Sequence, residues 1–303
     1  MTNIFNNEPS DYSPKAIKIL ETVGTYSEDI KPQKVQAIIT RLGFEINKQF
    51  LNDFPDLQYI LTATTGLNHI DLQECVKRNI TVVSLRGETD FLNSVAATAE
   101  HSIALLLSLL RHIPSAFDDV KKYHWDRMTF KGHELKGKTL SILGMGRLGI
   151  QVGTIAKSFG MNLKCYDIKS NDTFPTTDNL SEVLSNTDVV SIHLPYTSET
   201  HHLISQELLM TTNPGAYLIN TSRGQILKED DLIQCLNNGH LAAAAVDVLE
   251  HEYNLQNSPL VQYSITHNNL IITPHIGGCT YESMEATEVF IANKFAAMIR
   301  SIQ

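Results

Sequence analysis

A chain of 303 residues is long enough for two domains, each with its own hydrophobic core. The formal net charge of −9 argues against nucleic acid or an anionic membrane as the main partner. The four cysteines lie far apart without a CxxC spacing, which predicts reduced thiols in a cytoplasmic protein and no zinc site.

The N-terminal stretch MTNIFNNEPSDYS has neither the basic nor the apolar region of a signal peptide, so none is expected. Short apolar runs at residues 2–6, 35–40, 57–63 and 80–85 predict the first strands. Ser13 followed by Pro14 is typical of a helix start, and predicts a helix through Leu20. Residues 94–113 predict one long helix whose apolar run, 103–110, is too short to cross a bilayer.

The alternation of strands and helices becomes regular after Lys138. The predicted strands are residues 139–146, 161–167, 188–194, 216–220, 241–248 and 270–274, and the predicted helices are 147–160, 180–186, 205–211 and 228–238. A last helix is expected from about Tyr281 to the end. Six strands with helices between most of them predict a doubly wound dinucleotide-binding domain.

The stretch GMGRLG gives a G-x-G-x-x-G motif at Gly144, Gly146 and Gly149, directly after a strand and at the start of a helix. In that context the glycines allow a tight turn, approach of a pyrophosphate and close helix packing. The next strand ends in Asp167. Its carboxylate would accept hydrogen bonds from the ribose hydroxyls of a dinucleotide and would repel the 2′-phosphate of NADP. The glycine motif and Asp167 together therefore predict binding of NAD rather than NADP. The alternatives are that the glycines only form a structural turn and that Asp167 is an ordinary solvated residue.

Ligands of an open α/β sheet bind at the carboxyl ends of the strands. Polar side chains lie at the ends of consecutive predicted strands or just beyond them: His193, Arg223, Asp247, Glu250, Glu252 and His275. Each has an ordinary structural explanation by itself, so the prediction rests on their occurring together at one edge.

This set suits the oxidation of a 2-hydroxy acid. Histidine changes charge near neutral pH, so His275 can take the hydroxyl proton and return it in the reverse direction. Glu252 would orient the imidazole and stabilise its protonated form. Arg223 offers a planar fork to a carboxylate. Asp247 is predicted to hold the nicotinamide carboxamide, while Thr273-Pro274 stiffens the chain before His275, and Gly277 and Gly278 leave room for the ring.

The chain resembles the D-isomer-specific 2-hydroxyacid dehydrogenase family, in its phosphoglycerate-dehydrogenase-like branch. The resemblance covers nearly the whole chain through the motifs TTGLNHID, ATAEHSIALLL, ELKGKTLSILGMGRLG, DVVSIHLPYTSET, NPGAYLINTSRG, AAAVDVLEHE and TPHIGGCTYES. It implies a Rossmann NAD domain, residues 94–278, inserted in a flavodoxin-like substrate domain, residues 1–93 plus 279–303. It also implies a site in the cleft and a homodimer joined through the NAD domains.

The resemblance implies Arg223, Glu252 and His275 as the catalytic set, and adds the backbone N–H groups of Gly66 and Leu67 for the substrate carboxylate. The substrate is expected to contact Thr65, Gly66, Leu67, Arg223 and His275. The cofactor is expected to contact Gly144, Gly146, Arg147, Leu148, Gly149, Asp167, His193, Leu194, Pro195, Thr221, Ser222, Asp247, Gly277 and Gly278.

Some features depart from the family pattern and leave the substrate open. Asn68 and His69 replace the commoner residues of the substrate loop. Arg86 lies in the segment 85–94, which differs from the family's commonest form, and it is expected to contact either a second negative group of the substrate or solvent. We expect a small D-2-hydroxy acid such as 3-phosphoglycerate, glycerate or a related sugar acid. The alternatives are an NAD sensor without turnover and a phosphite-type dehydrogenase. A chain that ends at Gln303 is not expected to carry a C-terminal regulatory domain.

Overall fold

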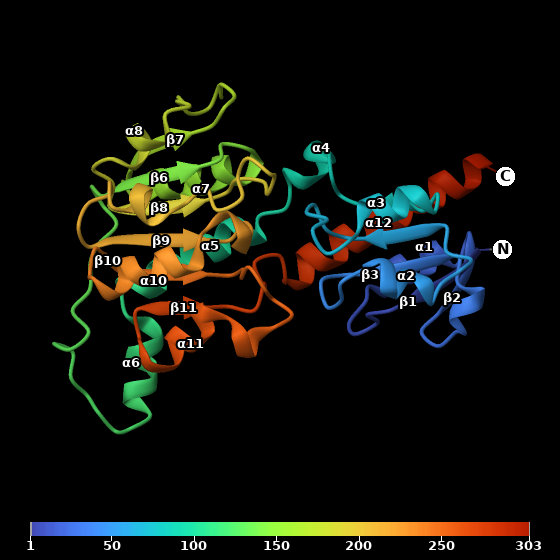
Figure 1. Ribbon diagram of the computed structural model, residues 1–303, viewed down its shortest axis with the longest axis horizontal. Coiled ribbons are helices and arrows are strands. Elements are labelled where there is room, and N and C mark those ends of the chain that lie inside the picture. Colours follow the sequence, from blue (N-terminus) through green and yellow to red (C-terminus); the bar gives the residue numbers. More distant parts are fainter. Residues whose placement is uncertain (1, 303) are drawn as a thin grey trace. The chain divides into compact units, whose positions relative to one another are not determined.

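In the computed structural model, which describes residues 2–302, the chain forms two compact units. Unit 1 comprises the chain up to Val95 together with the chain from Cys279 onward, and unit 2 comprises Ala96–Gly278. Each unit has its own parallel sheet with helices on both faces (Figure 1). The predicted class, two doubly wound α/β domains, is confirmed.

Unit 2 is built on a parallel sheet with the strand order β11-β10-β9-β8-β6-β7. Its strands are β6 (Thr139–Leu143), β7 (Asn162–Tyr166), β8 (Val189–Ile192), β9 (Ala216–Asn220), β10 (Leu241–Val246) and β11 (Leu270–Ile272). These are the six strands that the sequence predicts. The direction of winding reverses between β6 and β8, so the carboxyl ends of these two strands form the switch point where ligands bind in such sheets.

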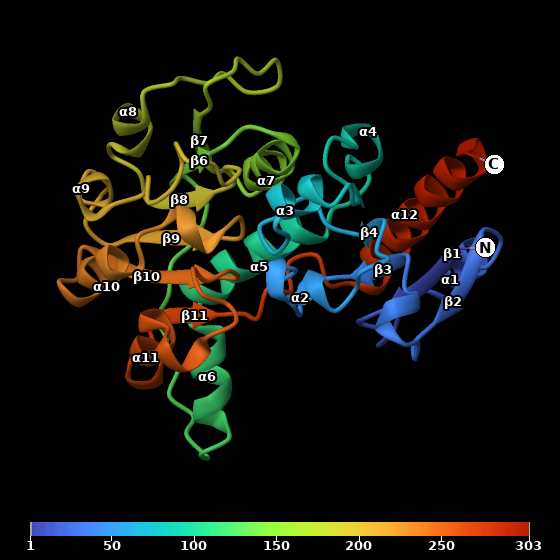
Figure 2. The same cartoon turned by 45° about the vertical axis from the view of Figure 1, so that its right-hand side comes forward.

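The two faces of this sheet carry separate cores, because alternate residues of each strand point to opposite faces. In β9, Ala216 and Leu218 pack on one side, and Tyr217 and Ile219 pack on the other. Figure 2 shows the two helical layers. One consists of α5 (Ala97–Leu110) and α7 (Arg147–Ser158), and the other of α8 (Leu180–Leu184), α9 (Gln206–Leu209), α10 (Glu229–Asn237) and α11 (Pro259–Thr266).

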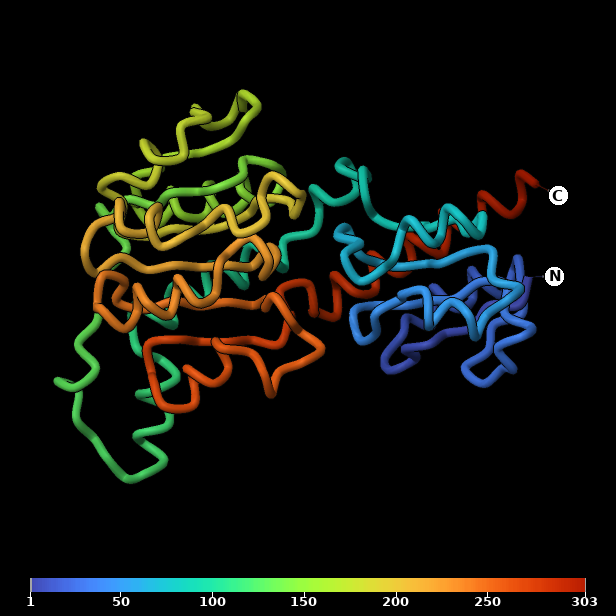
Figure 3. Tube along the Cα trace, in the orientation of Figure 1, coloured from blue at the N-terminus to red at the C-terminus, as the bar shows by residue number. Residues whose placement is uncertain are grey.

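Unit 1 has a parallel sheet in the flavodoxin-like order β2-β1-β3-β4-β5. Its strands are β1 (Thr2–Asn6), β2 (Gly24–Ser27), β3 (Ala37–Thr40), β4 (Tyr59–Thr62) and β5 (Thr81–Val83). One face is covered by α1 (Pro14–Leu20) and α12 (Tyr281–Ile302), and the other by α2 (Lys48–Asn52) and α3 (Leu72–Lys77). In Figure 3 the red trace of α12 runs beside the blue N-terminal segment, so the two ends of the chain share one core.

The buried carboxylate of Glu288 fixes α12 to the N-terminal part of unit 1. One oxygen accepts from the backbone N–H of Ser13 (2.7 Å), and the other accepts from Nε (3.2 Å) and Nη2 (2.5 Å) of Arg41. Burial raises the pKa of Glu288. Its removal would leave the Ser13 N–H and the Arg41 guanidinium without their charged acceptor.

Replacing Glu288 by Leu is therefore expected to lower the free energy of unfolding by about 2–3 kcal/mol, as measured by urea denaturation. Glu285 provides a matched control on the same helix, because its ion pair with Lys15 lies at the surface. Glu285→Leu should cost less than about 1 kcal/mol, and equal losses for the two variants would contradict the assigned role of Glu288.

The structure corrects the prediction of one helix over residues 94–113. Helix α5 begins at Ala97 and ends at Leu110, and His112 adopts a left-handed conformation with φ of 53°. A second helix, α6 (Ile113–Val120), begins there with Pro114 in its first turn. Proline lacks the N–H that a continuing helix needs, so it starts a new helix at this point. The short elements are α4 (Thr89–Leu92), η1 (Pro32–Lys34), η2 (Gly224–Ile226) and η3 (Leu255–Asn257).

All four cysteines are free thiols, three of them buried and Cys279 exposed. No helix within residues 2–302 combines the length and the apolar character that crossing a bilayer requires.

Candidate active site

The glycine-rich loop joins β6 to α7 at the carboxyl edge of the unit 2 sheet. Gly144 has φ of +100°, and a Cβ there would lie 2.7 Å from the backbone of His193. A Cβ on Gly149 would lie 2.1 Å from the Gly144 carbonyl oxygen, whereas the space around Gly146 is open. Gly146 is the N-cap of α7, and no side chain caps the helix. The loop therefore offers the helix N-terminus to an anion the size of a pyrophosphate.

Asp167 follows β7 directly and lies against this loop. Its Oδ2 accepts the N–H of Met145 (2.8 Å), and its Oδ1 accepts the N–H of Lys169 (2.9 Å). Each carboxylate oxygen has a further lone pair, so ribose hydroxyls can still donate to it. The structure thus brings the acidic residue to the glycine loop, as a ribose-binding role requires.

Replacing Asp167 by Ala is expected to weaken NAD binding by about 1.5–3 kcal/mol and to narrow the gap to NADP, because the charge that repels a 2′-phosphate is lost. Fluorescence titrations with both nucleotides measure this. Asp167→Asn removes the charge but keeps the support of the loop, because the amide oxygen can still accept a hydrogen bond from the Met145 N–H. An unchanged ratio of NAD to NADP affinity in both variants would contradict the role of Asp167.

His193 lies at the switch point beside Gly144, and its N–H donates to the Leu143 carbonyl (2.7 Å). Its Nε2 is 2.8 Å from Ser191 Oγ, whereas its buried Nδ1 has no hydrogen-bond partner within the described part of the chain. Burial lowers the pKa of His193 to about 3, so the ring is neutral near pH 7. An unsatisfied buried nitrogen at the switch point fits a site that a ligand completes.

Arg223 stands on a tight loop after β9. A Cβ on Gly224 would lie 2.0 Å from the carbonyl carbon of Leu249, so only glycine lets this loop pack directly against the loop after β10. The Arg223 Nη1 donates to the carbonyl of Ser222 (2.5 Å). Burial lowers the pKa of Arg223, and the nearby carboxylate of Glu252 opposes that shift. The close packing of the two loops therefore brings the guanidinium near Glu252.

The predicted contact between His275 and Glu252 is present. The Nδ1 atom of His275 lies 2.8 Å from Oε2 of Glu252, and the N–H of Leu249 donates to Oε1 at 3.3 Å. The two side chains are 22% and 27% exposed. A carboxylate that accepts from Nδ1 fixes the tautomer and leaves Nε2 to exchange a proton with a ligand.

Asp247 anchors the segment that carries His275. Its Oδ1 accepts from the Thr273 hydroxyl (2.5 Å) and the Ile276 N–H (2.9 Å), and its Oδ2 accepts from the Gly277 N–H (2.7 Å). A Cβ on Gly277 would lie 2.9 Å from that Oδ2, which explains the glycine. The predicted contact of Asp247 with nicotinamide stays a prediction.

Two features of this segment were not predicted from the sequence. His101 on α5 approaches it, with Nε2 3.2 Å from Asp247 Oδ1 and 3.1 Å from Thr273 Oγ1. Nothing in the spacing of the sequence links a histidine on an apolar helix to a loop so distant in the chain. The second feature is the backbone of His275, which has a left-handed conformation with φ of 55°. Gly277 and Gly278, the residues expected to allow a bend, do not have a positive φ.

Other predicted cofactor residues make contacts within unit 2. Thr221 Oγ1 lies 2.7 Å from Ser102 Oγ, and Ser222 Oγ donates to Asn220 Oδ1 (2.8 Å). Burial lowers the pKa of Arg147, and Leu148 packs against the core. Leu194 is buried and Pro195 is exposed. Their contacts with a cofactor stay predictions.

Glu250 does not join Glu252 at His275. Its Oε1 lies 3.0 Å from Nε2 of His202, on the segment that follows β8. Of the two glutamates in this loop, Glu252 alone contacts His275 in the part of the chain that the structure describes.

The predicted substrate loop of unit 1 follows β4. The Thr64 hydroxyl donates to the carbonyl of Gly66 (3.0 Å), which shapes the loop over Thr65, Gly66 and Leu67. Within residues 2–302, no acceptor is found for the N–H groups of Gly66 and Leu67. Both groups are therefore available to donate hydrogen bonds to a substrate carboxylate. The Arg86 side chain is exposed, so both interpretations of it remain. A role for this loop in substrate binding stays a prediction.

Comparison with known proteins identifies the family. Residues 103–277 match the model of the D-isomer specific 2-hydroxyacid dehydrogenase, NAD binding domain. The chain belongs to the D-isomer-specific 2-hydroxyacid dehydrogenase family. Unit 2 is accordingly its NAD-binding domain, and the open glycine loop, Asp167 and the unsatisfied Nδ1 of His193 fit that cofactor.

Relatives in this family include a D-3-phosphoglycerate dehydrogenase of Bacillus subtilis, 34% identical over 252 residues, covering 82% of this chain and 46% of the relative. A glyoxylate reductase of Thermofilum pendens is 31% identical over 305 residues, covering 97% and 84%. The chain spans about half the length of the phosphoglycerate dehydrogenases it matches. A crystal structure of D-lactate dehydrogenase from Aquifex aeolicus with NAD and lactic acid is similar, with a TM-score of 0.83, 28% identity and coverage of 99% and 96%.

Proposed function

We propose that this protein is an NAD-dependent dehydrogenase that interconverts a small D-2-hydroxy acid and its 2-keto acid. The observation that carries the proposal is the 2.8 Å contact between His275 Nδ1 and Glu252 Oε2, next to Arg223, in the NAD-binding domain of the family. A histidine held by a carboxylate on one nitrogen is suited to proton transfer at the other.

In the proposed reaction, His275 Nε2 takes the proton of the substrate hydroxyl, or returns it in the reduction. Glu252 keeps the imidazole in the tautomer that this requires and stabilises the imidazolium that forms. Arg223 holds the substrate carboxylate and polarises the adjacent carbonyl oxygen. NAD, when bound, accepts the hydride at C4 of its nicotinamide or supplies it from the reduced form.

The substrate class follows from the relatives, which are named for phosphoglycerate, glyoxylate and lactate. These acids share a carboxylate beside the carbon that changes oxidation state. We propose 3-phosphoglycerate, glycerate or a related sugar acid as the substrate.

The test is incubation of the purified protein with NAD and a panel of D- and L-2-hydroxy acids, with phosphite included, while the absorbance of NADH is followed. Turnover of one or more D-acids is expected, with no turnover of the L-isomers. NAD binding without turnover of any D-acid, or of the matching 2-keto acids with NADH, would favour an NAD sensor instead. Turnover of phosphite alone would favour the phosphite-type alternative.

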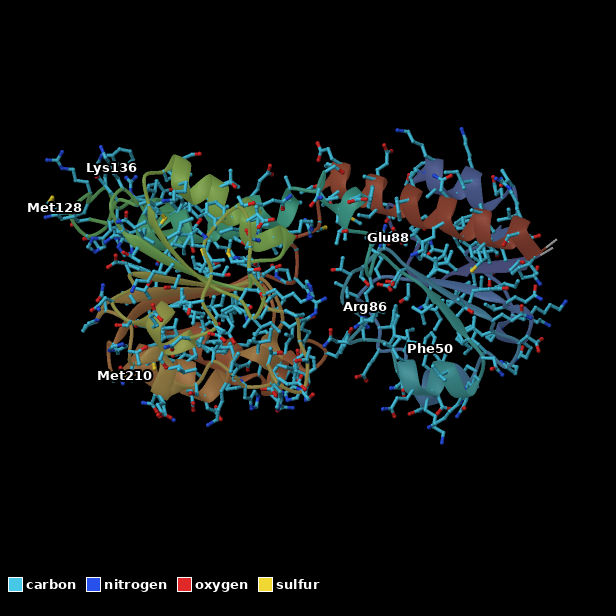
Figure 4. All side chains as sticks on the ribbon, turned by 90° about the horizontal axis from the view of Figure 1, so that it is seen from above. Phe50, Arg86, Glu88, Met128, Lys136 and Met210 are labelled. Carbon is cyan, nitrogen blue, oxygen red and sulfur yellow. The ribbon has the colours of Figure 1, made fainter. Side chains whose placement is uncertain are left out.

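We further propose that the protein is a homodimer, joined through α6 and the loop after it. Within 16 residues, this segment exposes six large apolar side chains, and such clusters mark interaction surfaces. They are Ile113, Phe117, Val120, Tyr123, Trp125 and Met128. In Figure 4, Met128 projects from the loop at the edge of unit 2. Beside the segment lies a groove of about 600 Å³ whose lining includes Phe130, Tyr217, Tyr263 and Ile271.

In a symmetric dimer, the apolar segment of each chain can pack into the groove of the other chain. The native protein is expected to have twice the 33.8 kDa mass of the chain in sedimentation or light scattering. Replacing Phe117 and Trp125 together by Asp should yield monomers, because charge would be buried in the interface. Met210→Asp, at an exposed apolar residue of α9's C-terminal end, is the control. A monomeric native protein, or a dimer that survives the double substitution, would contradict the proposal.

A further inference from the structure

Two histidines and a glutamate gather in unit 2 away from the contact between His275 and Glu252. His201, His202 and Glu250 each offer one possible ligand atom, and these three atoms lie within 4.8 Å of one another. The imidazole rings of His201 and His202 are stacked, with centroids 3.9 Å apart and an interplanar angle of 21°. Imidazole and carboxylate together form the ligand set that Zn²⁺ prefers when cysteine is absent. We propose that His201, His202 and Glu250 bind one zinc ion.

One of the three distances between the ligand atoms is already close to what zinc requires. The Nε2 atom of His202 and Oε1 of Glu250 are 3.0 Å apart. Two ligands at about 2.0–2.1 Å from a tetrahedral ion lie roughly 3.3 Å apart. Insertion of the ion therefore separates this pair by a few tenths of an ångström. Because the rings of His201 and His202 are nearly parallel, the His201 ring must turn out of the stack before both can bind one ion. The exposed position of His201 allows this rotation.

The backbone holds two of the three ligands in place. His202 has φ of 50°, an uncommon conformation for a residue with a side chain, and its N–H donates to the carbonyl of Gln225 (2.8 Å). The N–H of Glu250 donates to the carboxylate of Glu229 (2.8 Å), and its carbonyl accepts from Nε2 of Gln225 (2.9 Å). Ligands fixed in advance lose less freedom when the metal binds.

The surroundings of His201 suit a ligand that binds through one nitrogen. Its Nδ1 lies 3.4 Å from the hydroxyl of Tyr196, and the two rings are in edge contact at 5.9 Å. When Nδ1–H donates to Tyr196, the lone pair of Nε2 is available to a metal, which is the usual arrangement around zinc-bound histidines. A further protein ligand is not needed, because water can fill the fourth position.

The test is isothermal titration of the tag-free full chain with zinc chloride, in a buffer that does not bind metals. One zinc ion per chain is expected. His201→Gln and Glu250→Gln should each weaken binding at least about tenfold, since each removes a ligand. His251→Gln is the matched control, because His251 is an exposed histidine on the same loop and lies outside the cluster. It should leave the zinc affinity unchanged.

Three results would overturn the proposal. The first is the absence of zinc binding to the native chain. The second is binding that neither His201→Gln nor Glu250→Gln weakens. The third is binding that His275→Asn abolishes while His201→Gln does not, which would assign the metal to His275 and Glu252. Visible absorption of bound Co²⁺, compared between the native chain and His201→Gln, reports the same ligands independently of activity.

Discussion

Replacing His275 by Ala is expected to lower kcat by about 10²–10⁴-fold while the affinity for NAD stays nearly unchanged. The imidazole is the group that we propose takes the substrate proton, and Glu252 cannot replace it because its carboxylate contacts Nδ1 of the same ring. Steady-state kinetics on the D-acid that proves active, with NAD affinity from fluorescence titration, measure the two quantities separately.

The left-handed backbone of His275 calls for a second variant. Alanine is strained at φ of 55°, whereas asparagine tolerates this conformation and lacks the proton-transferring ring. His275→Asn should lose as much turnover as His275→Ala and retain the fold. If either variant lost NAD binding to a comparable degree, or if the Asn variant retained turnover, the role of His275 in proton transfer would be wrong.

Replacing Arg223 by Lys is expected to reduce kcat/KM by about 100-fold, although the charge is kept. A lysine ammonium cannot reproduce the two parallel hydrogen bonds that a guanidinium forms with a carboxylate. The close packing of Gly224 against the backbone of Leu249 restricts the loop movement that could compensate. Kinetics over a range of acid concentrations measure the loss.

Arg111→Lys is the control for this experiment, because Arg111 is exposed and follows α5 far along the chain from the candidate site. It should have native kinetics. Native kinetics of Arg223→Lys would exclude a bidentate contact between Arg223 and the substrate.

The parts of the fold that follow from local patterns were predictable. Strands β6, β8, β9 and β10 of unit 2 are mostly buried, mostly apolar runs bounded by turn residues. The glycine motif fixes the position of the first strand and helix. Strand β2, with the sequence GTYS, lies at the edge of its sheet and is too short and polar for its pattern to indicate a strand. Helix α11 was not predicted, although its start has a recognisable sequence pattern: Ser258 caps the helix and Pro259 occupies its first turn.

The residues of the candidate site were predicted from their positions after consecutive strands, which parallel strands bring to one edge. Their pairing could not be predicted in the same way. Glu250 and Glu252 are two residues apart in one loop, yet one contacts His202 and the other contacts His275. Which glutamate faces which histidine depends on tertiary contacts, such as that between Glu250 and Glu229, that no local pattern records.

The most direct measurement is a crystal structure of the protein with NADH and a 2-keto acid bound together. We expect the 2-oxygen of the acid to lie within about 2.6–3.2 Å of His275 Nε2, with Glu252 still on Nδ1 and the carboxylate of the acid on the guanidinium of Arg223. An acid bound with its 2-oxygen away from His275, or a His275 ring separated from Glu252, would contradict the proposed chemistry.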